Sequence, residues 1–147
     1  MKGSCPMMGF EKLLLATDGS ESARAAIQEA INIAKVCSNR LFVISVVEVN
    51  PEYEALAPQV VEKAENEVRE HLDSIKEQAE KEGITCETIA HQGEEPFKFI
   101  VDEAKKNKAD MIIMGSHGRT GLKRLMMGSV TARVIGHAPC KVLVVPC

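Results

Sequence analysis

A glycine-rich segment near the carboxyl terminus is the part of the sequence best suited to chemistry. An apolar run ends at Gly115 and Gly118 follows it, while Gly128 and Ser129 open a predicted helix. Glycine lets a backbone approach a ligand closely because it carries no Cβ atom. The first turn of a helix presents N–H groups without intrahelical partners at the positive end of the helix dipole. The segment therefore predicts an anion site, with phosphate as the first candidate.

Basic side chains between these glycines have the right charge for a phosphate ligand. They are Arg119, Lys123 and Arg124. We favour phosphate neutralisation for Arg119, and the sequence leaves open whether Lys123 and Arg124 only make the loop soluble. The segment is neither a P-loop nor the Gly-x-Gly-x-x-Gly fingerprint of dinucleotide sites. A glycine-rich turn that merely connects a strand to a helix is therefore the alternative.

Two further polar side chains are candidates for ligand contact. Asp18 directly follows the strand-like run at 12–17. A carboxylate accepts hydrogen bonds from ribose hydroxyls, and it also stabilises turns. His117 precedes Gly118 and is expected to act through its backbone as much as through its ring. The sequence shows no partner that would tune Asp18 as a general base, so no catalytic residue is assigned.

The composition argues against several classes of function. The formal net charge is −3, with 27% charged residues and a pI near 5.8, which is unlike a nonspecific nucleic-acid-binding domain. Four Phe, one Tyr and no Trp provide few platforms for stacking single-stranded bases. No apolar run has the length of a membrane span or a signal peptide, so we expect a cytoplasmic protein without a membrane partner. The five cysteines form no Cys-x-x-Cys pair and predict neither a disulfide framework nor a zinc site.

Short apolar runs alternate with helical periodicity along the chain. Strands are predicted at 12–17, 41–47, 84–90, 111–114 and 141–146, and helices from Ser20 onward and at 59–82, 96–106 and 129–136. Residues 48–57 are predicted as a loop because Pro51 lies within them and Pro58 follows. This alternation predicts an α/β fold with an open, doubly wound parallel sheet and helices on both faces. A chain of 147 residues suits one domain, here 10–147, after a flexible tail at 1–9.

The predicted sheet brings the two informative loops together. Ligands of such sheets bind beyond the carboxyl ends of the strands, where the strand order reverses. Asp18 follows the first predicted strand and Gly115 ends the fourth. If these strands are neighbours, Asp18 faces the glycine loop across one crevice, and the two loops form one site.

Several segments share their spacing with a known family. They are Gly115-x-x-Gly118 followed after nine residues by Gly128-Ser129, the segment Leu-Leu-Ala-Thr-Asp-Gly-Ser, the strand end Ser45-Val46-Val47, Gln92-Gly93, and the closing Pro-Cys-Lys-Val-Leu-Val-Val-Pro. Across residues 10–146 the chain thereby resembles the universal stress protein family. One departure is Ala16, where a subgroup has proline, and it leaves open the local shape of the adenine wall.

The resemblance implies a single domain with a five-stranded parallel sheet in the order 3-2-1-4-5 and an ATP site. Ala16 and Thr17 would line the adenine side, Val46 would contact adenine, and Asp18 would contact the nucleoside. With Arg119 added for its charge, the predicted nucleotide-binding residues are Ala16, Thr17, Asp18, Val46, Met114, Gly115, His117, Gly118, Arg119, Gly128, Ser129, Val130 and Thr131. Mg²⁺ or Mn²⁺ would be held through the phosphates.

The function implied by the resemblance is that of an ATP-binding regulatory protein of the stress response. Hydrolysis would be slow, because the chain lacks the P-loop lysine and an evident base to position water. The alternatives are a nucleotide-free dimeric interaction module and, less favoured, an ATP-using enzyme of the same superfold. Such enzymes carry Ser-Gly-Gly-x-Asp-Ser where this chain has Ala-Thr-Asp-Gly-Ser-Glu.

A homodimer through the last strand is expected as well. The strand Lys141 to Val145 is short, apolar and terminal, and an exposed edge of this kind invites pairing. The flanking Pro139 and Pro146 leave a monomer with a protected edge as the alternative. The sequence does not identify a signalling partner.

Overall fold

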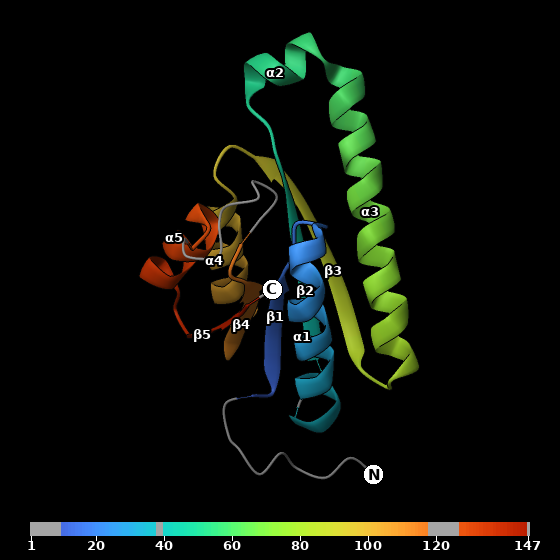
Figure 1. The fold of residues 1–147 in the computed structure, drawn as a ribbon, viewed down its shortest axis with the longest axis vertical. Helices are drawn as coiled ribbons and strands as arrows, with labels where there is room; N and C mark the ends of the chain where they lie inside the picture. The colour runs from blue at the N-terminus through green and yellow to red at the C-terminus, as the bar shows by residue number, and fades with distance from the viewer. Residues whose placement is uncertain (1–9, 38–39, 118–126, 147) are drawn as a thin grey trace.

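The computed structural model describes residues 10–37, 40–117 and 127–146 (Figure 1). The predicted tail at 1–9 and most of the predicted phosphate loop, including Gly118, Arg119, Lys123 and Arg124, lie outside the described residues. The predictions made for these residues therefore remain predictions.

Five parallel strands form one sheet in the order β3-β2-β1-β4-β5. They are β1 (Lys12–Ala16), β2 (Arg40–Glu48), β3 (Thr85–Gly93), β4 (Met111–Gly115) and β5 (Lys141–Val145). β1 pairs directly with β4, with Leu13 opposite Met111 and Ala16 opposite Met114. The strand order therefore reverses between β1 and β4, and the predicted doubly wound fold is confirmed.

Helices cover both faces of the sheet. A 3-10 turn (Glu21–Ala23) leads into α1 (Arg24–Cys37), and the other helices are α2 (Pro51–Leu56), α3 (Pro58–Lys81), α4 (Pro96–Lys106) and α5 (Ser129–His137). Side chains of α1 and α3 pack on one face, and those of α4 and α5 pack on the other. Figure 1 shows α2 at the top of the view, beyond the end of the sheet.

The prediction of a loop at 48–57 is wrong. β2 continues to Glu48, and α2 begins at Pro51. Asn50 caps this helix, since its side-chain oxygen accepts a hydrogen bond from the Tyr53 N–H over 2.7 Å. Proline is well suited to the first helical position because its missing N–H would have no partner there. The Asn-Pro pair is thus a helix start rather than a loop.

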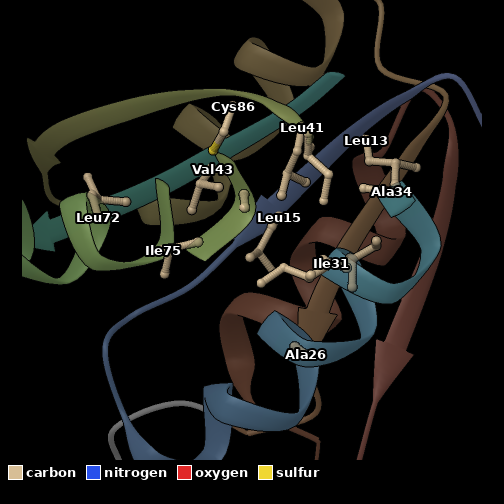
Figure 2. Close-up of a cluster of buried hydrophobic side chains, with 14 of the residues drawn as sticks. Leu13, Leu15, Ala26, Ile31, Ala34, Leu41, Val43, Leu72, Ile75 and Cys86 are labelled. Carbon is tan, nitrogen blue, oxygen red and sulfur yellow. The ribbon is translucent and has the colours of Figure 1, made fainter. Parts of the chain in front are cut away.

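Strand β1 lies at the centre of the core. Leu13, Leu14 and Leu15 are fully buried, as expected for a strand covered on both faces. Leu13 and Leu15 pack with Ile31 of α1 and Leu72 of α3, a cluster shown in Figure 2. Leu14 points to the opposite face, where the core cluster is completed by Ile44, Ile100, Ile112, Met114 and Val134. This strand anchors the loop that follows it, Thr17 to Ser20.

Gly83 ends α3, as predicted. Its φ is +79°, a conformation that glycine adopts without the Cβ penalty. The Gly83 N–H donates to the Glu80 carbonyl over 3.0 Å, and the Ile84 N–H donates to the Ala79 carbonyl over 3.1 Å. This pair of bonds is a Schellman motif, which directs the chain into β3.

The state of the cysteines agrees only in part with the prediction that the chain has no disulfide framework. Cys86 and Cys140 are free thiols. Cys37, at the end of α1, takes part in a disulfide bond. Within the described part of the chain, no helix combines the length and apolar character needed to cross a membrane.

Candidate functional site

A cavity of about 360 Å³ lies at the carboxyl ends of β1, β2 and β4. Small-molecule sites commonly have this size. Its lining includes every predicted site residue that the structure describes, namely Ala16, Thr17, Asp18, Val46, Met114, Gly115, His117, Gly128, Ser129, Val130 and Thr131. The predicted crevice between the Asp18 loop and the Gly115 segment is therefore present. Gly118 and Arg119, the other two predicted residues, are outside the described residues.

The first turn of α5 forms one end of this cavity. The Ala132 N–H donates to the Gly128 carbonyl over 3.0 Å and makes the first bond of the helix. The N–H groups of Ser129, Val130 and Thr131 therefore have no partner within the helix. Backbone N–H groups in this arrangement, together with the helix dipole, favour an anion.

Gly128, rather than Ser129, is the N-cap of α5. Gly128 has an extended conformation with ψ of 148°, and no side chain caps this helix. Its N–H donates to the Ser116 carbonyl over 2.8 Å, which joins the helix start to the chain leaving β4. Ser129 is the first residue of the helix, and its exposed hydroxyl does not cap α5.

Thr131 joins α5 to β4 by a side-chain bond. Its hydroxyl donates to the Gly115 carbonyl over 2.8 Å, and the residue is only 3% exposed. Because the hydroxyl proton is engaged by the backbone, the donor that Thr131 offers an anion is its main-chain N–H. Nearby, Ser116 Oγ and His117 Nδ1 lie 2.8 Å apart, an arrangement that orients the His117 ring.

Asp18 is held in a turn on the other side of the crevice. Its Oδ1 accepts hydrogen bonds from the N–H of Ser20 over 2.9 Å and from the Ser20 hydroxyl over 2.6 Å. The alternative reading of Asp18 as a turn residue is therefore correct as far as it goes. The same bonds fix the carboxylate at the cavity wall, so a turn role and a ligand contact are compatible.

Thr17 connects the cavity to α3. Its N–H donates to the Ile44 carbonyl over 3.0 Å, and its Oγ1 lies 3.0 Å from Nε2 of His71. No sequence signal marks His71, because the residue belongs to the regular pattern of a long amphipathic helix. Through this contact α3 fixes the side chain at the end of β1.

The main chain of Val46 is available at the edge of β2. The Thr17 N–H bonds to the Ile44 carbonyl, and the β1–β2 register ends at this point. In a parallel ladder alternate residues direct both main-chain groups to the same neighbour, so the next residue of β2 that faces this side is Val46. No residue of β1 continues the ladder beside it. The N–H and C=O of Val46 thus face the cavity. A planar heterocycle with a donor and an acceptor on one edge could form a pair of hydrogen bonds with them.

Sequence reasoning missed one wall of the cavity. The wall contains Tyr53 of α2 and the apolar residues Val60, Val61, Ala64 and Val68 of α3. The incorrect prediction of a loop at 48–57 explains why Tyr53 was not expected in this wall. The signal that would have found it is Asn50 before Pro51, a favourable capping residue followed by the residue favoured at the first helical position.

Comparison with protein families identifies a family over nearly the whole chain. The model of the universal stress protein family matches residues 9–146. Among curated proteins, the universal stress protein MJ0531 of Methanocaldococcus jannaschii is 40% identical over 140 residues, covering 92% of this chain and 82% of that protein.

Solved structures share the fold over nearly the whole chain. The hypothetical protein MJ0577 is 30% identical with a TM-score of 0.80, covering 95% of this chain and 98% of its own. The universal stress protein UspA from Lactobacillus plantarum is 25% identical with a TM-score of 0.82, covering 92% and 97% of the two chains.

Two more distant structures contain adenine nucleotides. A universal stress protein in complex with cAMP is 23% identical with a TM-score of 0.63, covering 92% of this chain and 96% of its own. The universal stress protein from Archaeoglobus fulgidus in complex with dAMP is 23% identical with a TM-score of 0.64, covering 93% and 98%. At this identity the likeness concerns the fold.

Proposed function

Because the chain belongs to the universal stress protein family, we propose that it binds ATP at the carboxyl edge of its sheet and acts as a nucleotide-dependent regulatory protein of the stress response. One observation carries this proposal. One cavity joins the first turn of α5, whose leading N–H groups have no partner within the helix, to the main-chain edge of Val46, across the point where the strand order reverses. The first of these features suits phosphate and the second suits a base.

The phosphate end is the start of α5. The N–H groups of Ser129, Val130 and Thr131 would donate to phosphate oxygens, and Gly115 and Gly128 leave room for a close approach. Arg119, predicted from the sequence, would add positive charge. Among the described residues, no three His, Cys, Asp or Glu side chains are grouped as a metal site. Mg²⁺ or Mn²⁺ would therefore be held through the phosphate oxygens.

The nucleoside end lies between β1 and β2. The N–H and C=O of Val46 would bond the adenine edge, with Ala16, Thr17 and Met114 lining its surroundings. Asp18 would accept hydrogen bonds from the ribose hydroxyls, because Ser20 fixes its carboxylate at the cavity wall. The complexes of related proteins with cAMP and dAMP support the class of ligand, since both contain adenine.

The proposed role is regulation with at most slow hydrolysis. The carboxylate of Asp18 is hydrogen-bonded to Ser20, and the His117 ring is held by Ser116. Neither arrangement gives a base positioned for water, and the P-loop lysine is absent from the sequence. The alternative, a nucleotide-free interaction module, would leave the cavity without a ligand role.

We also propose a homodimer through β5. This strand is at the edge of the sheet, and its residues from Val142 to Val145 are partly exposed. The Ser116 N–H donates to the Val145 carbonyl over 3.1 Å, so by alternation the main chain of Val144 faces the open edge. Val144→Pro removes that N–H in an edge strand, where proline is tolerated. Light scattering tests the proposal, because a 16.0 kDa wild-type species contradicts it.

The first experiment asks whether purified protein contains bound nucleotide. Protein prepared without added nucleotide is denatured, and the supernatant is separated by anion exchange with mass detection. ATP or ADP near one per chain supports the proposal. An empty protein that also fails to bind ATP by calorimetry contradicts it and favours the interaction module.

A matched pair of variants tests the phosphate end. Ser129→Pro deletes one N–H at the first position of α5, where proline is favoured, and the extended Gly128 suits a residue before proline. Ser129→Ala removes only the hydroxyl. Because hydrogen bonds to charged groups are strong, we expect Ser129→Pro to weaken ATP binding by about tenfold or more, with a much smaller effect of Ser129→Ala. Equal affinity of the two variants would show that phosphate does not bind the start of α5.

A further inference from the structure

The cavity has a wall that the proposed nucleotide contacts do not use. Tyr53 of α2 and Val60, Val61 and Ala64 of α3 line it. This wall lies on the α1–α3 side of the sheet, whereas α5 packs on the other face. It is apolar, and it is therefore unsuited to phosphate. Of the lining residues that the structure describes, Tyr53 is the one with a benzene ring.

Helix α2 is positioned by hydrogen bonds at its ends rather than by core packing. None of its residues is buried. The Asn50 side chain caps it, the Val49 N–H donates to the Gly93 carbonyl over 3.0 Å, and Gln92 Nε2 donates to Glu54 Oε1 over 3.4 Å. The bonds to Gly93 and Gln92 attach α2 and the residues before it to the end of β3, next to the cavity. Tyr53 is 48% exposed there, so packing in the core does not explain its position.

A bound base would give this side chain a partner. A base that bonds in its plane to the Val46 edge keeps its two faces available for apolar contact. Aromatic rings prefer offset stacked or edge-to-face arrangements, and such pairs add to the free energy of burial. Val60, also 48% exposed in the same wall, would be covered by the same ligand.

We propose that Tyr53 covers the base of the bound nucleotide and strengthens the site's selection of nucleoside polyphosphates over polyphosphate alone. This inference rests on the proposed nucleotide function, and it concerns a residue outside the glycine signature and the Asp18 loop. Phosphate contacts at α5 cannot distinguish ATP from inorganic tripolyphosphate. A side chain that contacts the base can.

The wild-type protein provides a direct measurement. Tyr53 is the single tyrosine of a chain without tryptophan, so tyrosine emission reports this residue alone. Nucleotide-depleted protein is titrated with ATP and, separately, with inorganic tripolyphosphate. We expect saturable quenching by ATP and an unchanged emission with tripolyphosphate. Free tyrosine amide under the same additions corrects for absorption by the nucleotide.

Substitutions of Tyr53 measure how much its ring contributes to ATP affinity. Tyr53→Ala is expected to weaken ATP binding by about three- to tenfold, and Tyr53→Phe by less than about twofold, because the ring makes the contact. Both should leave tripolyphosphate affinity unchanged. Leu56→Ala is the matched control, since Leu56 belongs to the same helix, is 84% exposed and does not line the cavity.

The possible results distinguish the role of Tyr53 from the proposed ATP binding on which it rests. ATP binding by the wild type without quenching, and with equal affinity of Tyr53→Ala, overturns the role of Tyr53 and leaves nucleotide binding intact. A parallel loss of ATP and tripolyphosphate affinity in Tyr53→Ala also overturns it. Absence of ATP binding to the wild type overturns both proposals.

Discussion

The hydroxyl of Thr131 donates a hydrogen bond to the main-chain carbonyl of Gly115 over 2.8 Å, between residues sixteen positions apart in sequence. This bond joins the first turn of α5 to the end of β4. A second bond, from the Gly128 N–H to the Ser116 carbonyl over 2.8 Å, joins the same two elements. These two hydrogen bonds therefore hold the start of α5 at a fixed distance from the end of β4.

Replacing Thr131 by valine tests the contribution of this bond. The variant keeps the shape of the side chain but leaves the Gly115 carbonyl without this donor. We expect unfolding to become easier by about 1–2 kcal/mol and ATP binding to weaken, because the start of α5 loses its attachment. Urea denaturation and calorimetry measure the two effects. Thr131→Ser, which retains the hydroxyl, is the control, and equal behaviour of both variants would exclude the bond as the cause.

Gly93 is predicted to tolerate no larger side chain. A Cβ at this position would lie 2.5 Å from Cε2 and 2.7 Å from Cζ of Phe99, whose ring stacks on His91 at a centroid distance of 4.9 Å. Gly93→Ala should therefore destabilise the fold by about 1–3 kcal/mol, as overpacking does. Thermal or urea unfolding provides the measurement.

Gly136 is the matched control for that substitution. Nothing lies within 4 Å of a Cβ added there, and the residue is in α5. Because alanine favours helix more than glycine, Gly136→Ala should stabilise the protein by about 0.5–1 kcal/mol. A Gly93→Ala variant as stable as Gly136→Ala would show that Phe99 moves aside without cost.

Much of the fold could be predicted because local and tertiary signals agree. The apolar run around Leu14 has the length of a strand covered on both faces, and Gly83 marks the end of α3 with its positive φ. The meeting of the two loops could be predicted for a related reason. Gly115 ends β4 and Asp18 follows β1, two strands whose carboxyl ends meet at one edge, and both residues line the cavity.

The remainder depends on contacts that no local pattern contains. His71 occupies an ordinary position of an amphipathic helix, and only the packing of α3 brings its Nε2 to 3.0 Å from Thr17 Oγ1. Tyr53 was missed for another reason. The loop prediction treats Pro51 as a loop residue, although Asn50 before it supplies a helix cap. A capping residue such as Asn50 directly before a proline is the local signal that favours a helix start over a loop.

Removal of two buried hydroxyl groups, those of Ser45 and Thr17, should have different effects on stability. Ser45 is 1% exposed, and within the described parts of the chain its Oγ finds no hydrogen-bond partner. Burial of an unpaired hydroxyl is unfavourable, so Ser45→Ala should be neutral or stabilising by up to about 1 kcal/mol. Thr17→Val removes a hydroxyl that contacts His71, and it should destabilise by about 1 kcal/mol. Urea unfolding of both variants tests the difference, and a destabilising Ser45→Ala contradicts the assignment.

Cys86 should make stability depend on alkaline pH. Burial raises the pKa of its thiol from 9.0 to about 11, with Lys76 acting in the opposite sense and Glu80 and Glu87 in the same sense. Between these values the unfolded chain has lost the proton that the native state keeps. By linkage, the stabilisation is complete below about pH 9 and declines as the pH rises toward 11.

The measurement compares the free energy of unfolding of the wild type and Cys86→Ala from pH 8 to pH 11. Burial also raises the pKa of Cys140, so both proteins should lose stability, and the difference in slope isolates Cys86. We expect a steeper loss in the wild type, because the variant has no thiol to ionise at this position. A thiol reagent at pH 8 adds a second readout, since a buried protonated thiol reacts slowly until urea exposes it. Equal slopes together with rapid labelling of native Cys86 would contradict the raised pKa.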